Sequence, residues 1–497
     1  MTVVRHELDQ AGNDELGQLA IDILRRTARP EQIRLPSGAR RNSGAFRSRR
    51  ILAVVRPADV SQLRTLVCDL VQLGGGRLHV YPVSSGRNWG FGSAEPVSDG
   101  AIVLDMSGLD AVRLLDAEAG VAVVEPGVSQ GELAARLQGT RYFLNVTASS
   151  ATTSVVGNVL DRGVGLHRQR TDDLIGLEVV LADGTTAHVG RWPGRDVAAA
   201  PYAFQPGPSA LHLFTQSNLG VVTAVAVRLM PRPQAQRVVR LSFDAARLAD
   251  AVDRLRTFHA NGLTSGIIKI FSAGARAAYG GEGSPGYYAY LHVRGTAALV
   301  AATVDELGKA VAEGGVFADS YVLDPEADPG ESVAERAALR GYAGDPGAND
   351  AMVSGIFGTD ADRVDSAGAD GWLFCVPVVP FTAAAIAGVS RLLNEQAQRV
   401  TPRVVLGHTL NVLPDGWVDA VVTIRFARTR ADEAQAHELL DTLHERLAAS
   451  GFHPYRLDIE HMRAAPGLRG DPGQEEILRR LKAVLDPSAL ISRGRYE

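Results

Sequence analysis

Cysteine and lysine are scarce in this chain of 497 residues. Two cysteines, Cys68 and Cys375, are too few for a disulfide framework or a four-thiolate zinc site. A reduced compartment is therefore the simpler interpretation. The three lysines, at positions 269, 309 and 482, leave few candidates for covalent lysine chemistry. No His, Cys and Asp residues have the spacing of metal ligands, so we expect no metal.

Long apolar runs and an excess of basic charge are also lacking. Apolar stretches such as 220–227 fall well short of the ~20 residues that cross a bilayer. The first residues, MTVVRHELDQ, are polar and acidic, unlike a signal peptide. The formal charge is 51 − 56 = −5, which offers no extended basic surface. We expect a cytoplasmic protein without membrane or nucleic-acid partners.

The apolar pattern predicts strands alternating with helices, which favours an α/β or α+β fold. The pattern of predicted helices and strands changes after Pro231 and Pro233, where we place a domain boundary. Beyond it, longer helices and strands alternate again. Residues 324–360, rich in Gly, Asp and Ala, are expected to form a loop or a lid.

Three glycine-rich segments carry the functional signal. Residues 82–92 (PVSSGRNWGFG) follow a predicted strand, and their backbone N–H groups could surround a pyrophosphate. Residues 154–165 (SVVGNVLDRGVG) and 216–223 (QSNLGVVT) are similarly open to close contact with a ligand. Each segment alone could equally be an ordinary glycine-rich turn.

The order and spacing of these segments resemble the vanillyl-alcohol oxidase and para-cresol methylhydroxylase family. The likeness covers residues 51–231 and returns at 454–456 and 490–496. It implies an α+β protein, with a two-subdomain FAD-binding fold of the para-cresol methylhydroxylase type and an α+β cap domain with an antiparallel sheet. We expect the FAD-binding domain at 1–233, the substrate-binding cap at 234–450, and a C-terminal segment, 451–497, that returns to the FAD domain.

The resemblance also implies which residues bind FAD. They are Pro82, Ser84, Ser85, Gly86, Arg87, Asn88, Trp89, Gly90, Ser154, Gly157, Asn158, Gly163, Gly165, Ser217, Asn218, Gly220, Val222 and Arg495. Fixed amide dipoles and a few arginines suit the two phosphate charges of this cofactor.

Tyr455 and Arg456 match a Tyr-Arg pair that holds a phenolic substrate in the family, with the Arg close to flavin N1. A fixed guanidinium there stabilises charge that develops as hydride arrives at N5. We expect Tyr455 and Arg456 to be catalytic and, together with Phe91, to bind substrate. The alternative is a surface Tyr and an Arg paired with Asp458 or Glu460.

Three departures from the family pattern limit the transfer. Phe91 stands where relatives carry a third phenolate-binding Tyr. Residues 145–152 lack the acidic side chain that usually lies close to flavin N5. Strand 417–426 lacks the His or Tyr that often links the flavin, so we expect non-covalent FAD, with His408 as the nearest alternative attachment point. His453, Glu460 and His461 flank the Tyr-Arg pair and could supply a base.

We predict an FAD-dependent oxidoreductase that removes a hydride from a phenolic, aromatic or conjugated alcohol-type small molecule. Because serines are weakly basic, dehydrogenation is favoured over water-dependent hydroxylation. The alternatives are an oxidase of non-phenolic alcohols or hydroxy acids, and a non-catalytic flavoprotein. Oxygen or a redox carrier would accept the electrons, and a homo-oligomer is possible.

Overall fold

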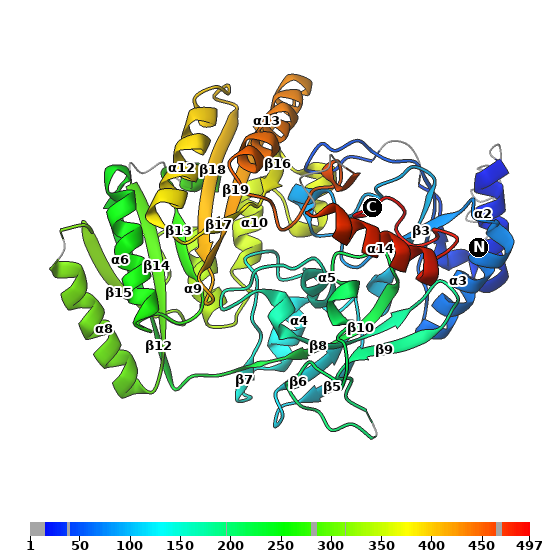
Figure 1. Cartoon of the computed structure of the whole chain (residues 1–497), viewed down its shortest axis with the longest axis horizontal. Helices are drawn as coiled ribbons and strands as arrows, with labels where there is room; N and C mark the ends of the chain where they lie inside the picture. The colour runs from blue at the N-terminus through cyan, green and yellow to red at the C-terminus, as the bar shows by residue number, and fades with distance from the viewer. Residues whose placement is uncertain (1–14, 37–39, 195, 280–285, 314, 464–469) are drawn as a thin grey trace.

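The structure, a computed structural model, describes residues 15–36, 40–194, 196–279, 286–313, 315–463 and 470–497. Helices and strands are mixed throughout, as the predicted α+β class requires. Figure 1 shows two bodies side by side, one built from the N-terminal half and one from the large green-to-orange sheet. None of the described helices combines the length and apolarity needed to cross a membrane.

The first sheet has four short strands in the order β1-β2-β4-β3. Strands β2, β4 and β3 are parallel, and β1 is antiparallel to β2. Its apolar residues share one core with the amphipathic helices of the N-terminal region. The bounds are β1 (Ile33–Arg34), β2 (Ile51–Val55), β3 (His79–Val83), β4 (Ala101–Asp105), α2 (Glu15–Thr27) and α3 (Val60–Gly74).

The second sheet is antiparallel, in the order β5-β6-β10-β8-β9, and has its own core. Two short helices lie beside it, and a two-stranded ribbon, β7 with β11, leads toward the third sheet. The bounds are β5 (Val112–Asp116), β6 (Val121–Val124), α4 (Gln130–Arg136), β7 (Tyr142–Phe143), α5 (Val155–Leu160), β8 (Leu174–Val180), β9 (Thr186–Gly190), β10 (Val221–Arg228) and β11 (Met230–Pro231).

The third sheet is antiparallel and follows the path β15-β12-β14-β13-β18-β19-β16, with β17 also paired to β19. Four long helices, α6, α8, α12 and α13, cover one of its faces in the largest core. The bounds are β12 (Ala235–Asp244), α6 (Leu248–Ala260), β13 (Ile268–Phe271), β14 (Gly286–Gly295), α8 (Ala297–Ala312), β15 (Asp319–Leu323), β16 (Asp370–Cys375), β17 (Val378–Pro380), α12 (Ala383–Ala397), β18 (Val404–Val412), β19 (Trp417–Ala427) and α13 (Arg430–Ala449).

Smaller helices cover the other face. The expectation that 324–360 is a loop or lid is wrong, because this segment contains α9 (Val333–Tyr342) and α10 (Asn349–Phe357). Both helices bury apolar side chains in small cores, which offset the low helix propensity of the glycines. Two further short helices, α7 (Ala273–Ala278) and α11 (Val364–Ala367), lie in the same part of the chain.

The C-terminal chain returns to the N-terminal body, as Figure 1 shows in red. Helix α14 (Pro472–Leu485) leads to a segment that runs beside β3, where Val80 pairs with Ile491. Upstream, the backbone at Pro454 pairs with Pro377, and the Ile459 N–H donates to the Phe91 carbonyl. Segment 454–463 is therefore held between the third sheet and the loop after β3.

Candidate functional site

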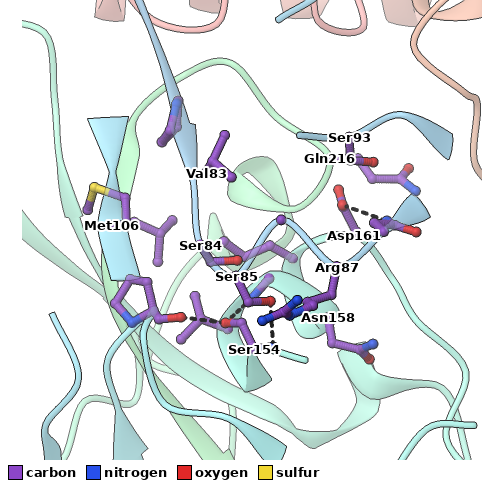
Figure 2. Close-up of a pocket in the computed structure, with 18 of the residues that line it drawn as sticks. Val83, Ser84, Ser85, Arg87, Ser93, Met106, Ser154, Asn158, Asp161 and Gln216 are labelled. Atoms are coloured by element: carbon purple, nitrogen blue, oxygen red, sulfur yellow. Dashed lines mark hydrogen bonds between the residues drawn. The ribbon is translucent and has the colours of Figure 1, made fainter. Parts of the chain in front are cut away.

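One cavity is lined by all three glycine-rich segments and by the C-terminal return (Figure 2). The loop after β3, the N-terminus of α5 and the turn into β10 meet there although they are far apart in sequence. The predicted site residues that line it are Pro82, Ser84, Ser85, Gly86, Arg87, Asn88, Ser154, Gly157, Asn158, Ser217, Gly220, Val222, Arg456 and Arg495.

The loops pack closely because small residues stand where they touch. A Cβ on Gly157 would lie 2.4 Å from Ser84 Oγ. The Ser154 N–H donates to Ser85 Oγ at 3.0 Å, and Ser154 Oγ caps α5 by accepting from the Gly157 N–H. Gly86 adopts a φ of +65°, which suits glycine. The loop after β3 and the start of α5 thus form one wall of the cavity.

Asp161 links two arginines of the cavity. Its Oδ2 accepts from Arg456 Nη2 at 2.7 Å, and its Oδ1 pairs with Arg495. Burial disfavours the charged carboxylate, but the two guanidinium groups outweigh it and hold the pKa of Asp161 below its usual range. Two cations share one anion, so this centre carries a net positive charge.

Asp161 was missed by the sequence analysis, although it lies inside the second glycine-rich segment. Its acidic side chain between Leu160 and Arg162 was the available signal. Gln216 was missed as well. It lines the cavity, adopts a φ of +49°, and donates from Nε2 to the Tyr455 carbonyl at 3.0 Å.

Arg456 pairs with neither Asp458 nor Glu460. The alternative interpretation, in which one of these two acids is the partner of Arg456, is therefore wrong. Glu460 pairs with Arg49, and Asp458 contacts two histidines. The Arg456 guanidinium instead lies over the Phe91 ring, 4.3 Å from its centroid. Phe91 is buried and contacts Phe374 of the third sheet.

Seven predicted residues lie outside the cavity lining. Trp89 packs against Phe357 of α10, and a Cβ on Gly90 would meet the Phe374 ring. Gly163 and Gly165 lie against the side chains of Asn158 and Asn145. The remaining three are Phe91, Asn218, which donates to Glu497, and Tyr455.

Tyr455 lies beside the third sheet, with its ring 6.1 Å from that of Trp417. Burial, reinforced by the nearby Asp419 carboxylate, raises the pKa of Tyr455 well above its usual value. The phenol therefore stays protonated and can donate a hydrogen bond.

The third sheet turns a polar face toward Tyr455. Alternate residues of β19, from Val418 to Phe426, pack in the helical core, so Asp419 on the same strand faces the other way. Lys269 Nζ donates to Asn411 Oδ1 at 2.7 Å, and Asn411 Nδ2 donates to Asp419 Oδ2 at 3.0 Å. This series of hydrogen bonds, from Lys269 through Asn411 to Asp419, crosses three neighbouring strands, β13, β18 and β19.

Lys269, Asn411 and Asp419 are all buried. Asp419 Oδ1 has no hydrogen-bond partner among the described residues. Burial raises the pKa of Asp419 to about 6 and lowers the pKa of Lys269 to about 8. A free carboxylate oxygen with such a pKa can accept a proton near neutral pH. The sequence does not single out Asp419, because strand alternation alone does not reveal which face of the sheet meets the site.

A second cavity lies on this polar face. Aromatic rings of β13, of β14 and of Tyr279 at the end of α7 form much of its wall. Glu331, just before α9, and Glu335, within α9, add acidic groups. It is lined by Phe271, Arg276, Tyr279, Tyr288, Tyr290, Glu331, Ser332, Val333, Ala334 and Glu335. Phe271 shares its strand face with Lys269.

Residues 145–152 carry no acid of their own, but helix α10 brings one to them. Asp350 Oδ1 accepts from Ser150 Oγ at 2.7 Å and from the Ala151 N–H at 3.0 Å. Asn349 donates to the carbonyls of Thr147 and Ser149. These bonds fasten the loop to the helix and occupy the near oxygen of the Asp350 carboxylate.

The other histidine and acid candidates lie away from the cavity. His408 faces the helical layer, with Nε2 3.2 Å from Ser390 Oγ of α12. His461 contacts Asp458, and Glu460 pairs with Arg49. His453 is exposed, and its carbonyl accepts from the Val378 N–H. None of these four lines the cavity.

Comparison with known proteins agrees with this geometry. A family model described as an FAD binding domain matches residues 51–190. The 4-cresol dehydrogenase [hydroxylating] flavoprotein subunit of Pseudomonas putida is 34% identical over 36% of each chain. The crystal structure of p-cresol methylhydroxylase with substrate bound superposes with a TM-score of 0.85 over 98% of both chains, at 20% identity. In sequence and in fold, the chain resembles the vanillyl-alcohol oxidase and para-cresol methylhydroxylase family.

The FAD-binding match and the oxidoreductase relatives indicate an FAD-dependent oxidoreductase, and the superposition shows the para-cresol methylhydroxylase fold. A more extended sequence match is the 1'-carboxy-chondrochloren decarboxylase of Chondromyces crocatus. It is 28% identical over 90% of this chain and 91% of that protein.

The cavity fits FAD in two respects. Asn158 Oδ1 and Arg456 Nε are buried without a partner in the described residues, and buried polar groups are normally satisfied. The net positive charge beside Asp161 suits an anionic cofactor.

Proposed function

We propose that this protein oxidises a phenolic, aromatic or conjugated small molecule by dehydrogenation. The proposal is carried by the position of Tyr455, whose phenol lies within the electrostatic reach of both the Asp419 carboxylate of the third sheet and the Arg456–Asp161 pair of the cavity. When bound, FAD accepts a hydride at N5. A phenolic substrate is consistent with the similarity to a 4-cresol dehydrogenase.

The predicted FAD-binding residues divide by position. The backbone of 84–88 and the start of α5 would hold the pyrophosphate, and 216–222 would hold the adenine–ribose half. Arg87 would act structurally, because its guanidinium donates to the Ala361 carbonyl and pairs with Asp362 of the cap. The remaining predicted residues lie outside the cavity lining and would support these loops by packing against them: Trp89, Gly90, Gly163, Gly165 and Asn218.

Arg456 would stabilise negative charge on the reduced cofactor and orient an anionic substrate. Its position over Phe91 and against Asp161 fixes the guanidinium in a partly dry site, where charge interactions are strong. Tyr455, protonated by virtue of its raised pKa, would donate a hydrogen bond to substrate oxygen. Phe91 would contribute its ring but no hydroxyl.

Asp419 would accept a proton from the substrate hydroxyl. Its free Oδ1 and its pKa near 6 meet the requirement for a base close to the working pH. Lys269, held through Asn411, would favour the ionised form of Asp419.

A second candidate is oxidative decarboxylation, favoured by the match to a decarboxylase over 90% of this chain. In a para-(2-carboxyethyl)phenol, the benzylic C–H bond would break with transfer of a hydride to FAD. The C–C bond to the carboxylate would then break, releasing CO₂, and its electron pair would form a new C=C bond. No water is added, so this reaction also needs no base in residues 145–152.

The test is anaerobic reduction of the purified flavoprotein by para-alkylphenols, aromatic alcohols, carboxyethyl phenols and 2-hydroxy acids. Bleaching by one of the first two groups supports the proposal, and bleaching with release of CO₂ identifies the second candidate. Bleaching by 2-hydroxy acids alone would contradict both candidates and indicate a hydroxy-acid oxidase. No bleaching by any compound would indicate a non-catalytic flavoprotein. Repeating turnover with oxygen or an artificial carrier would identify the electron acceptor.

A further inference from the structure

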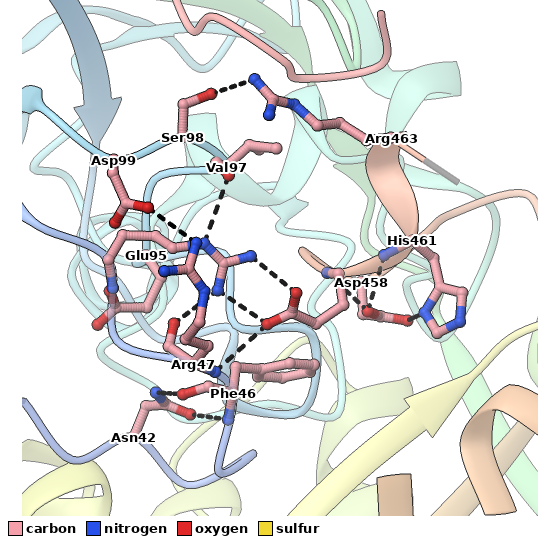
Figure 3. A network of polar contacts seen from close by, with 12 residues as sticks. Asn42, Phe46, Arg47, Glu95, Val97, Ser98, Asp99, Asp458, His461 and Arg463 are labelled. Atoms are coloured by element: carbon pink, nitrogen blue, oxygen red, sulfur yellow. Dashed lines mark hydrogen bonds and ion pairs between the residues drawn. The ribbon is translucent and has the colours of Figure 1, made fainter. Parts of the chain in front are cut away.

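A second group of ionisable side chains lies outside the cavity, where α13 packs against segment 454–463. Asp458 Oδ2 lies 3.3 Å from His444 Nε2 and 2.8 Å from His461 Nδ1. Figure 3 shows the Asp458 carboxylate directed at the His461 ring. One oxygen and two nitrogens, all within 4.8 Å of one another, therefore converge on one point.

Each of the three side chains has a partner on its outer side. Cys375 Sγ lies 3.8 Å from His444 Nδ1, and Asp441 Oδ1 lies 3.3 Å from His461 Nε2. Asp458 Oδ1 accepts from the backbone N–H groups of Glu460 and His461. Metal-bound histidines commonly donate their other ring N–H to an acceptor of this kind, which fixes the ring and its tautomer.

We propose that His444, Asp458 and His461 bind one divalent transition-metal ion, with zinc as the best fit. Two imidazoles and one carboxylate are a common zinc donor set, with water in the fourth position. Around a tetrahedral zinc with bonds of about 2.0–2.1 Å, donor atoms lie about 3.3 Å apart. The His444–Asp458 separation of 3.3 Å matches that value, whereas the His461–Asp458 hydrogen bond of 2.8 Å would have to lengthen by about 0.5 Å around an ion.

The surroundings allow an ion to enter and be held. His444 and Asp458 are almost fully buried, whereas the His461 side chain is 13% exposed and Asp441 is on the surface. His461 therefore gives access from solvent. The sequence did not reveal the site because 14 residues separate His444 from Asp458, and only the packing of α13 brings them together.

A bound ion would connect the cap to the segment that carries Tyr455 and Arg456. His444 belongs to α13, which packs on the third sheet, whereas Asp458 follows Arg456 by two residues. The ion would thus restrict the position of this segment. The proposal does not depend on the nature of the substrate.

The experiment is metal counting on untagged flavoprotein that has been stripped with a chelator and dialysed against zinc. We expect about one equivalent of zinc per chain. Asp458→Asn and His461→Ala should retain only background zinc. His437→Ala is the matched control, because His437 lies on the same helix but contacts the Gly44 carbonyl, and it should keep its zinc.

Two further measurements guard against a variant that fails to fold. Zinc should raise the unfolding temperature of the natural protein but not of His461→Ala, whose changed side chain lies at the solvent edge. Asp441→Ala, which removes only an outer partner, should weaken zinc binding about tenfold. Background zinc in the natural protein, or equal zinc in His461→Ala, would overturn the proposal.

Discussion

At the scale of single residues, contacts with Asp161, Phe91 and Ser93 hold Arg456 in place. Asp161 pairs with one edge of the guanidinium, and the Phe91 ring lies beneath its plane. Arg495 shares Asp161, so the centre keeps a positive charge after the ion pairs form. A cation held in this way needs no reorganisation when negative charge develops beside it.

Replacement of Arg456 by alanine should slow flavin reduction about 10²–10³-fold, because one fixed stabilising group is lost. The protein should fold and retain FAD. Stopped-flow measurement under anaerobic conditions gives the rate. Arg463→Ala is the control, since Arg463 bonds Ser98 outside the cavity. An Arg456→Ala protein that reduces its FAD at the natural rate would exclude the proposed role.

Asp419 should govern the pH dependence of the same step. A base must be unprotonated, so the reduction rate should rise with pH and level off above about 6. Asp419→Asn should lose this dependence and slow the reaction about 10²–10⁴-fold. An unchanged pH profile in the variant would assign the profile to another group.

The stability of Asp419→Asn separates a catalytic from a structural role. Folding raises the pKa of Asp419 from 3.8 to about 6, so the folded state holds this proton more tightly. The contribution of Asp419 to the free energy of unfolding therefore falls as pH rises from about 4 to 6. The variant should lose that slope and be no less stable than the natural protein at pH 7. A large loss of stability there would indicate a structural role.

At the scale of elements, the cavity depends on how closely α5 approaches the loop after β3. Gly157, in the first turn of α5, allows this approach because a Cβ would lie 2.4 Å from Ser84 Oγ. In the cap, the alternation of β18 and β19 decides which side chains face the Tyr455 side and which face the helices.

Gly157→Ala should lower the affinity for FAD about tenfold or more, because the added methyl group displaces Ser84. Fluorescence of FAD released on dilution measures the affinity. Gly388→Ala on α12 is the matched control, since a Cβ there meets no atom within 4 Å. Equal affinity in both variants would show that this contact does not shape the cofactor site.

FAD should be held without a covalent bond. Strand β19 carries neither His nor Tyr, and His408 of β18 faces Ser390 in the helical layer. Acid precipitation should therefore release all yellow colour into the supernatant. Colour that stays in the washed pellet would contradict this prediction, and peptide mapping would then identify the attachment point.

At the scale of the whole molecule, segments beside the third sheet hold loops of the N-terminal half in place. Asp350 of α10 bonds the loop 145–152, and Asp362 pairs with Arg87 of the loop after β3. The third sheet also contributes the chain from Lys269 to Asp419. The geometry of these loops therefore depends on segments more than 250 residues apart in the sequence, such as 87 and 362.

Turnover in ¹⁸O-labelled water should give a product without label at the oxidised carbon. Residues 145–152 supply only hydroxyl groups, which are weak bases, and the near oxygen of Asp350 already accepts two hydrogen bonds. Products that exchange oxygen with water need a parallel incubation as control. Stoichiometric label in a newly hydroxylated carbon would show that water addition is efficient here.

The sequence by itself determined the resemblance to a known family, the fold class and most of the cavity lining. Glycine-rich segments such as 82–92 and 154–165 are local in sequence. The small residues that allow close approach of the backbone are neighbours in the chain, so the sequence alone reveals them. Fourteen of the predicted site residues line the cavity for that reason. The expectation of a loop at 324–360 failed because burial against the cap overrides the weak helix propensity of its residues.

Only the tertiary structure decided which side chains meet across these segments. Asp161 finds Arg456 and Arg495 through contacts that span about 300 residues, and Asp419 acquires its pKa from burial rather than from its neighbours in sequence. His444 meets Asp458 and His461 only because α13 packs beside the returning chain. Such pairings depend on strand faces and helix packing, which local patterns leave undetermined.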